Sequence, residues 1–231
     1  PSADSAAVFG TQGFQNDSDG NAVVDWVFVE IRDASKLDSV VTTRAALLQR
    51  DGDVRDHRVL GDTRRIDPDG YSYLSFDSTL AGDYYVVVRH RNHLGVMTNT
   101  AGLYSPIVTK IDYTEKDFNA LGIHSQRMNF DSTEQYMWAG DVTSDRKVIY
   151  QGPNNDVDEM FFRVIAEPGN TDLLDNYIVP GYYRTDYNLD GKTIFQGPDN
   201  DRQMLIFQSI LQFPDNRVKF LANYVILEQL P

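Results

Sequence analysis

Apolar and polar residues alternate along the first half of the chain. Between Asp25 and Arg32, a face of Val27, Val29 and Ile31 alternates with a face of Trp26, Phe28, Glu30 and Arg32. This alternation is typical of an antiparallel sheet with one buried side. Similar apolar runs occupy residues 22–33, 42–54, 71–76, 83–91, 95–98 and 106–113. Because short turns and no helical periods separate these runs, we expect a mainly β protein that begins with an antiparallel β-sandwich.

The second half of the chain contains two short segments with helical periodicity. The first predicted apolar stripe consists of Val157, Met160, Phe161, Val164 and Ile165, and the second of Met204, Phe207, Ile210 and Leu211. Asp156 and Asp201 precede these stripes, and we expect both to be helix N-caps, with Glu159 completing a capping box in the first. Pro168 and Pro214 follow as stop signals.

These two helical segments belong to an internal duplication. Residues 140–170 align with residues 185–216, and the Asn-Tyr-Ile of 176–178 then matches the Asn-Tyr-Val of 223–225. Two copies of one unit usually pack together and bury the apolar side that neither could bury alone. We therefore expect a sandwich domain at 1–115, a connector at 116–137 and a duplicated region at 138–231, divided into 138–182 and 183–231.

Each copy opens with acidic and polar residues at every second position. The second offers Asp186, Asn188 and Asp190, then Gly191 for a sharp turn and the carbonyl of Lys192. Calcium prefers six to eight oxygen ligands, and this spacing supplies them from one tight loop. The corresponding ligands in the first copy are Asp141, Thr143, Asp145 and the carbonyl of Lys147. The sequence therefore predicts Ca²⁺ as a cofactor of two loops.

The closing ligand of each loop is displaced. An acidic residue is expected at position twelve, where this chain has Gly152 and Gly197. We expect the Gly-Pro segments to loop out and return Asp156 and Asp201 to the ion. Arg146 stands where the first loop needs a left-handed residue, so this loop should bind more weakly. The alternative is that both loops are turns held by Asp and Asn side chains without an ion.

The net charge and the composition of the chain limit the classes of partner that it could bind. The formal net charge of −13 argues against nucleic acid and anionic lipid as partners, because such a surface repels phosphate. The chain has no cysteine, which excludes disulfides and thiolate chemistry. No apolar run is long enough to cross a bilayer, so we expect no membrane insertion. The start at Pro1, without an initiator Met, suggests a processed secreted chain or an excised fragment.

Signals for catalysis are weak. The sequence has no His-Glu-x-x-His, Gly-x-Ser-x-Gly or Gly-rich phosphate loop. The cluster from Arg89 to His93 could bind a metal or move protons through His90 and His93. The competing interpretation is that its polar groups hydrogen-bond a loop between strands. We therefore expect a non-enzymatic protein, with a hydrolase as the remaining alternative.

Several stretches resemble known families. The 67–90 stretch, Asp-Pro-Asp-Gly-Tyr followed by Ala-Gly-Asp-Tyr-Tyr-Val-Val-Val, is similar to prealbumin-like and collagen-adhesin B-type sandwiches, which serve as stalks on bacterial surfaces. The duplicated loop and helix resembles the dockerin module. The chain as a whole is similar to C-terminal regions of large secreted proteins of Bacteroidota, which implies export to the cell surface or beyond. The motifs that begin at Asp4, Asp38, Asp77 and Asp131 resemble the O-glycosylation motif of that phylum.

These observations lead to two classes of function. The first is an extracellular structural or adhesive protein, stabilised by calcium, whose partner is another copy of itself or another cell-surface protein. The apolar segments at 5–9 and 223–231 could build a filament by strand exchange between copies. The second is a dockerin-like or glycan-binding interaction module of a larger secreted protein.

Overall fold

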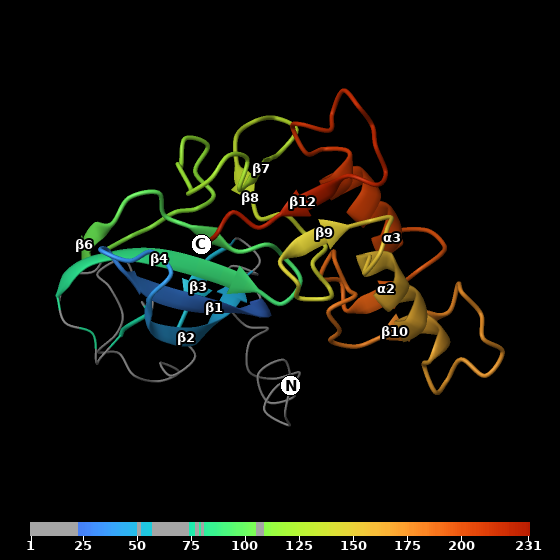
Figure 1. The fold of residues 1–231 in the computed structure, drawn as a ribbon. Coiled ribbons are helices and arrows are strands. Elements are labelled where there is room, and N and C mark those ends of the chain that lie inside the picture. Colours follow the sequence, from blue (N-terminus) through green and yellow to red (C-terminus); the bar gives the residue numbers. More distant parts are fainter. Residues whose placement is uncertain (1–22, 50–51, 57–73, 77–78, 80, 105–108) are drawn as a thin grey trace. The chain divides into compact units, whose positions relative to one another are not determined.

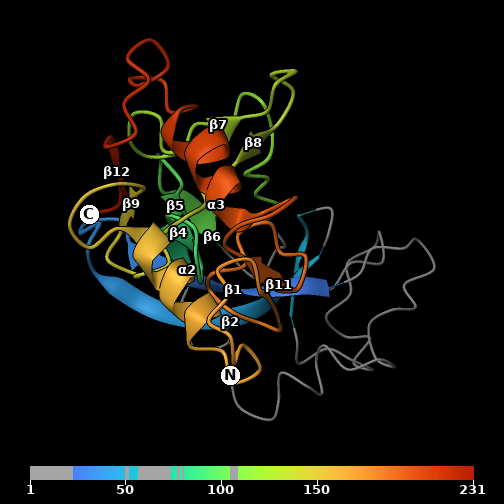
Figure 2. The same ribbon diagram turned by 90° about the vertical axis from the view of Figure 1, so that its right-hand side faces the viewer.

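The computed structural model describes residues 23–49, 52–56, 74–76, 79, 81–104 and 109–231 (Figures 1 and 2). The chain divides into two compact units. The first is Pro1–Val88 with Thr100–Ile111, and the second is Arg89–Asn99 with Asp112–Pro231. Four predicted features lie outside the described residues: the segment at 5–9, the turn at 67–70, and the motifs at Asp4 and Asp77.

The first unit is built on an antiparallel sheet. Its strands are β1 (Val23–Asp33), β2 (Val40–Gln49), β3 (Val54–Arg55), β4 (Gly82–His90) and β6 (Gly102–Tyr104). The sheet order is β3-β2-β1-β4-β5, with β6 also pairing with β4. The last two residues of β4 and the short β5 (Val96–Met97) group with the second unit.

One face of β1 is buried, as the alternation predicts. Val27, Val29 and Ile31 form a core with Ala46 and Val86 from the neighbouring strands. On the other face Phe28 is 53% exposed. Glu30 and Arg32 also lie on that face, but they are buried as an ion pair with 2.9 Å between Nη2 and Oε2. The sequence therefore predicts the buried face of this strand correctly.

Other strand boundaries differ from the prediction. The run at 42–54 is not one strand, because the chain turns through Gly52, whose φ is 96°, between β2 and β3. Residues 74–76 and 109–113 are described without strand geometry. The described part of the first unit thus shows one antiparallel sheet.

The second unit consists of short elements. Its strands are β7 (Arg127–Met128), β8 (Gln135–Tyr136), β9 (Lys147–Ile149), β10 (Ile178–Pro180), β11 (Lys192–Ile194) and β12 (Val225–Leu227). Its helices are α2 (Asp156–Ile165) and α3 (Asp201–Met204), which continues into the π-helix η3 (Leu205–Ile210). Residues 116–137, predicted as a connector, therefore contain a small hairpin of β7 and β8. Among the described residues, no helix combines the length and apolarity that a membrane span would need.

The two copies of the duplication exchange strands. The strand that ends the first copy, β10, pairs with β11 in the loop of the second copy, and Ile178 lies opposite Ile194. Reciprocally, β12 ends the second copy and pairs with β9 in the first, with Val225 opposite Ile149 (Figures 1 and 2). Since 178 aligns with 225 and 194 with 149, both pairings have the same register. Neither copy is complete without the other.

The core of the second unit lies between these paired copies. Trp138, predicted as a core residue, is 1% exposed, and its indole N–H donates to the carbonyl of His124 at 2.8 Å. Other fully buried members come from both copies: Val148, Met160, Leu205, Ile210 and Ile226. Burial of these side chains is the main stabilising contribution that the second unit can make.

The helical predictions are partly wrong. In α2, Met160 and Val164 are buried as predicted, whereas in the second copy Phe207 is 56% exposed. The cause is the phase of the predicted stripe, because Phe162, the equivalent residue in the regular helix α2, is also exposed, at 61%. The π-helical turn, with an i→i+5 bond from the Leu211 N–H to the Ile206 carbonyl, changes the spacing of the residues that follow. Leu205 is buried in place of Phe207, and Ile210, five residues later, is buried as predicted.

The predicted N-caps are also wrong by one residue. Asn155 caps α2 by accepting from the Asp158 N–H at 2.9 Å, and Asn200 caps α3 by accepting from the Gln203 N–H at 2.8 Å. The aspartates predicted as caps are the first helical residues, and their carboxylates bind elsewhere.

Candidate metal centre

The second loop is organised by the carboxylate of Asp186, which is 2% exposed. Its two oxygens accept hydrogen bonds from the backbone N–H groups of Asp190 at 3.1 Å and Gly191 at 3.0 Å. Asn188 Oδ1 also accepts from the Asp190 N–H at 3.0 Å, and Asp190 Oδ1 accepts from the Lys192 N–H at 2.9 Å. The four residues of this loop predicted as ligands on sequence spacing therefore lie in one tight turn with Gly191: Asp186, Asn188, Asp190 and Lys192.

The first loop has the same arrangement. Asp141 accepts from the N–H groups of Asp145 at 3.0 Å and Arg146 at 3.1 Å, and Asp145 accepts from the Lys147 N–H at 3.0 Å. The φ of Arg146 is 66°, which confirms the left-handed conformation expected at this position. Thr143 differs from its counterpart Asn188, because its hydroxyl lies 3.4 Å from an oxygen of Asp156.

Asp156 and Asp201 tie the two ends of each loop together. Asp201, 1% exposed, accepts from the N–H of Tyr187 at 2.8 Å and from that of Ile194 at 2.9 Å. Asp156, fully buried, accepts in the same way from Val142 at 2.9 Å and Ile149 at 2.8 Å. Each carboxylate thus reaches from the start of a helix to the first turn of its loop and to the strand that follows.

The Gly-Pro segment between each loop and its helix makes this reach possible. Gly152 and Gly197 have φ values of 138° and 136°, which a residue with a side chain rarely adopts. Asn154 and Asp199, two residues later, are both left-handed, with φ of 55° and 53°. The backbone of each segment therefore has two positive-φ residues before the aspartate at the start of the helix, whose carboxylate binds the loop.

Burial is the dominant influence on these carboxylates. It raises the pKa of Asp141, Asp186 and Asp201 to about 6, and that of Asp156 to about 7, against the opposing effect of the backbone N–H donors. A neighbouring acid also raises the pKa in each loop, since Asp141 acts on Asp156 and Asp186 on Asp201. In each loop the charge of one buried aspartate therefore disfavours ionisation of the other, and a cation near both carboxylates would remove that cost.

Cationic side chains near the loops are few. Arg91 Nη2 lies 3.8 Å from Asp186 Oδ2 and lowers its pKa. Lys147 Nζ lies 3.5 Å from Asp145 Oδ2 at a more exposed position. The charge of the buried carboxylates therefore remains partly uncompensated within the described part of the chain.

The oxygen atoms that the two loops offer are the type of ligand that a hard cation prefers. Within the ranges described above, no three histidine, aspartate or glutamate side chains are arranged as a ready metal site. A site in either loop would need other oxygens as well, and each loop offers an amide or hydroxyl oxygen and a backbone carbonyl. Each carboxylate oxygen also has a second acceptor position beyond its hydrogen bond to the backbone.

The histidine cluster has a structural contact that the sequence did not predict. His90 and His93 face each other with 2.9 Å between their Nδ1 atoms, and His93 Nδ1 lies 2.8 Å from Asn92 Oδ1. Asn92, fully buried, donates from Nδ2 to the carbonyls of Arg184 at 2.8 Å and Asp186 at 2.7 Å. Its own carbonyl accepts from the Gly140 N–H at 2.7 Å. Asn92 therefore fastens both loops, a long-range role that its local sequence does not indicate.

Comparison of the chain with protein-family models, with curated proteins and with solved structures returns no match to any of them. The interpretation of these loops therefore depends on their geometry.

Proposed function

We propose that this chain is a non-enzymatic, extracellular structural or adhesive protein whose duplicated region is stabilised by calcium. The observation that carries the proposal is the pair of loops with equivalent hydrogen bonds, each holding two buried aspartates. In the same proposal the first unit is a β-sandwich of prealbumin type, and the duplicated region is a relative of the dockerin module. Without cysteine, a bound ion would replace disulfides as a brace.

In the second loop, calcium would be held by Asp186, Asn188, Asp190, the carbonyl of Lys192 and Asp201. In the first loop the equivalent ligands are Asp141, Thr143, Asp145, the carbonyl of Lys147 and Asp156. The ion would neutralise buried carboxylates that the chain itself leaves short of cations. Because the loop ligands and the aspartate at the start of the helix come together only in the folded chain, binding would favour the folded state alone.

The test is a thermal melt with calcium and with chelator. An ion that binds only the folded protein stabilises it by about 2.7 kcal/mol at a concentration of 100 times its Kd. We expect EDTA to lower Tm and calcium to restore it, with Asp186→Asn abolishing most of the shift and Asp141→Asn a smaller part. Calcium should give a smaller shift at pH 5 than at pH 7.5, because protons compete for the same carboxylates.

Asp112→Asn is the matched control for these variants. Asp112 also holds a turn, accepting from the N–H of Thr114 at 3.0 Å and from its hydroxyl at 2.6 Å, but it is outside both loops. This variant should keep the full calcium shift. A wild-type melt that is the same in EDTA and in calcium would overturn the proposal and leave the loops as turns without an ion.

The proposal extends to assembly through the carboxyl-terminal strand. In the structure β12 pairs with β9 of its own chain, and Glu228 next to it accepts from Arg89 Nη1 at 3.0 Å and from the Gly95 N–H at 2.8 Å. Exchange of this strand between copies would form the same contacts in trans and would link molecules. Electron microscopy and light scattering across a concentration series test this, and a strict monomer at high concentration with calcium would reject it.

An interaction module is the second candidate. Phe162 and Phe207 occupy equivalent positions in the two copies and are 61% and 56% exposed. Exposed aromatic residues are typical of surfaces that bind another molecule. If the module docks a partner or a glycan, the double variant Phe162→Ser with Phe207→Ser should lose that binding while it keeps the calcium shift.

A further inference from the structure

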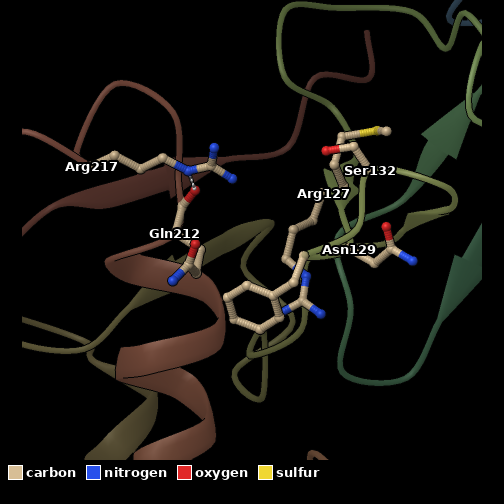
Figure 3. Close-up of a pocket in the computed structure, with 7 residues that line it drawn as sticks. Arg127, Asn129, Ser132, Gln212 and Arg217 are labelled. Carbon is tan, nitrogen blue, oxygen red and sulfur yellow. Dashed lines mark hydrogen bonds between the residues drawn. The ribbon is translucent and has the colours of Figure 1, made fainter.

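A second candidate site lies in the same unit, away from the acidic loops. A cavity of about 270 Å³ opens between residues 127–130 and Ser132 of the β7–β8 hairpin on one side and Gln212 and Arg217 on the other (Figure 3). Two of these lining residues are arginines and none is acidic. In a chain with a net charge of −13, such a cavity is distinct from the rest of the surface.

Hydrogen bonds hold both arginines in place. Arg127 Nη1 donates to the carbonyl of Gln208 at 2.9 Å and to its side-chain oxygen at 2.6 Å. Arg217 Nε donates to the carbonyl of Gln212 at 2.8 Å, a bond that Figure 3 also shows. These bonds fix the guanidinium groups before any ligand arrives, which reduces the entropy lost on binding.

The hairpin wall is equally well defined. Asn129 Oδ1 accepts from the Thr133 N–H at 2.8 Å, and Asn129 Nδ2 donates to the Thr133 hydroxyl at 2.8 Å. Ser132, at the tip, has a φ of 54°, a left-handed conformation that this network of bonds supports. Phe130 from the same hairpin is 81% exposed and adds an apolar surface next to the charged groups.

The arginines retain donors for a ligand. The hydrogen bonds of Arg127 use its Nη1, and the hydrogen bond of Arg217 uses its Nε. Among the described residues, neither guanidinium group forms an ion pair with a carboxylate. Burial lowers the pKa of the Arg127 guanidinium, and the nearby charge of Arg217 lowers it further. An anion bound in the cavity would offset this repulsion.

We propose that this cavity binds a small organic anion with a carboxylate or sulfate group, of the size of one acidic sugar. Two guanidinium groups match the planar or tetrahedral oxygens of such an anion with paired hydrogen bonds. The volume is just below the range of about 300–1,000 Å³ typical of sites for drug-sized ligands, which limits the ligand to about one ring. Phe130 and Met128 supply an apolar wall for the body of that ring.

The experiment is titration of the calcium-saturated protein with glucuronate, sodium sulfate and glucose, followed by calorimetry and by NMR of the arginine side chains. Saturable binding of glucuronate or sulfate, with none of glucose, is the expected result. Glucuronate alone would identify the carboxylate as the ligand group, and sulfate alone the sulfate. Binding of neither anion would overturn the proposal.

Variants of the lining arginines distinguish a specific anion site from nonspecific attraction of the anion to positive charge. Arg217→Gln removes an exposed charge from the cavity, and loss of its charge-assisted hydrogen bonds should weaken binding about 10- to 100-fold. Lys219→Gln removes the same charge from an exposed position outside the lining and should leave the affinity unchanged. Equal losses in the two variants would show that only net charge matters and would overturn the proposal. Arg127→Lys, which keeps the charge but not the paired donors, should also weaken binding.

Discussion

The two copies of the duplication share their backbone more closely than their side chains. Left-handed residues occur at equivalent places, with φ of 57° at Ser144 and 60° at Leu189, and of 66° at Arg146 and 83° at Gly191. A serine paired with a leucine, and an arginine with a glycine, have little chemistry in common. What the copies do share is the set of aspartates whose carboxylates bind the loop N–H groups, so these carboxylates determine the path of the backbone.

The copies diverge mainly in the helices that follow the loops. The helix of the first copy, α2, is regular over 10 residues, whereas α3 spans 4 and changes into a π-helix of 6. The loops themselves differ only in side-chain contacts: the Thr143 hydroxyl donates to Asp156 at 3.4 Å in the first copy, and Arg91 lies within 3.8 Å of Asp186 in the second. The backbone conformation is therefore more alike in the two loops than in the two helices that follow them. Equivalent substitutions in the two copies can measure how much each loop and each helix contributes to stability.

The largest effect is expected from loss of the aspartate that closes each loop. Asp201→Ala leaves the buried N–H groups of Tyr187 and Ile194 without their acceptor, at about 1–3 kcal/mol each, or about 2–6 kcal/mol in total. Asp156→Ala should cost somewhat more, because the hydroxyl of Thr143 also loses its bond to this carboxylate. Urea denaturation followed by circular dichroism measures both.

Asp172→Ala is the control for this pair. Asp172 is exposed, and removal of such a surface carboxylate should change the free energy of unfolding by no more than about 0.5 kcal/mol. Losses below about 1 kcal/mol in both Asp156 and Asp201 variants would show that the loops do not depend on these carboxylates. A large loss of stability in only one of the two variants would show that the two copies do not depend equally on this carboxylate.

A smaller effect is expected at the asparagine that follows each helix. Asn216, fully buried, donates from Nδ2 to the carbonyls of Ile210 at 2.8 Å and Leu221 at 2.9 Å. Asn170 makes the equivalent bonds to Val164 at 2.9 Å and Leu174 at 2.8 Å. Replacement of either by Ala should cost about 2–4 kcal/mol, from bonds lost in a buried environment.

This pair tests whether the π-helical turn matters. If the two losses agree, the asparagine fixes the end of the helix whatever its hydrogen-bond pattern. A much smaller loss at Asn216 would mean that the π-helix has already weakened that end. Asn223→Ala, at an exposed position, is the control and should have little effect on the urea midpoint.

Local patterns in the sequence predict much of this structure. The alternation around Val27 to Ile31 gives the buried face of β1, and the duplication correctly aligns loops, helices and closing strands. The spacing of polar residues also predicts which side chains gather in each loop, and the left-handed Arg146. These features depend on neighbours within a few residues, which is the range that periodicity and turn chemistry describe.

What the sequence could not show is determined over longer distances. Asn92 reaches the Asp186 carbonyl 94 residues later, and β12 crosses to the first copy rather than pairing with its own. The π-helical turn of the second copy, which has Leu205 and Ile210 buried in the core, likewise has no signal in the local sequence. The cap assignment failed for a different reason: Asn155 and Asp156 are both good caps, and the choice depends on where the aspartate is needed.

The smallest effect, and the one that compares the two loops most directly, is expected at their sixth position. A left-handed conformation costs about 1 kcal/mol for a residue with a side chain, so Gly191→Ala should destabilise by about that amount. An added methyl group at Gly191 meets no atom within 4 Å, so this loss would measure the backbone cost alone. Arg146→Gly should stabilise the first loop by less, about 0.5 kcal/mol, because glycine also gains freedom in the unfolded chain.

The control is Arg146→Ala, measured with the others by urea denaturation and by calcium titration. Arg146 Nε lies 3.7 Å from Glu228 Oε1 on a side chain that is 61% exposed, an ion pair worth little in water. The alanine variant loses this pair but keeps the left-handed strain, so it should be close to neutral while the glycine variant is more stable. If both variants lose stability equally, the ion pair and not the backbone decides the sixth position. The weaker calcium binding proposed for the first loop would then need another cause, and Thr143→Asn, which introduces the residue of the second loop, is the next variant to test.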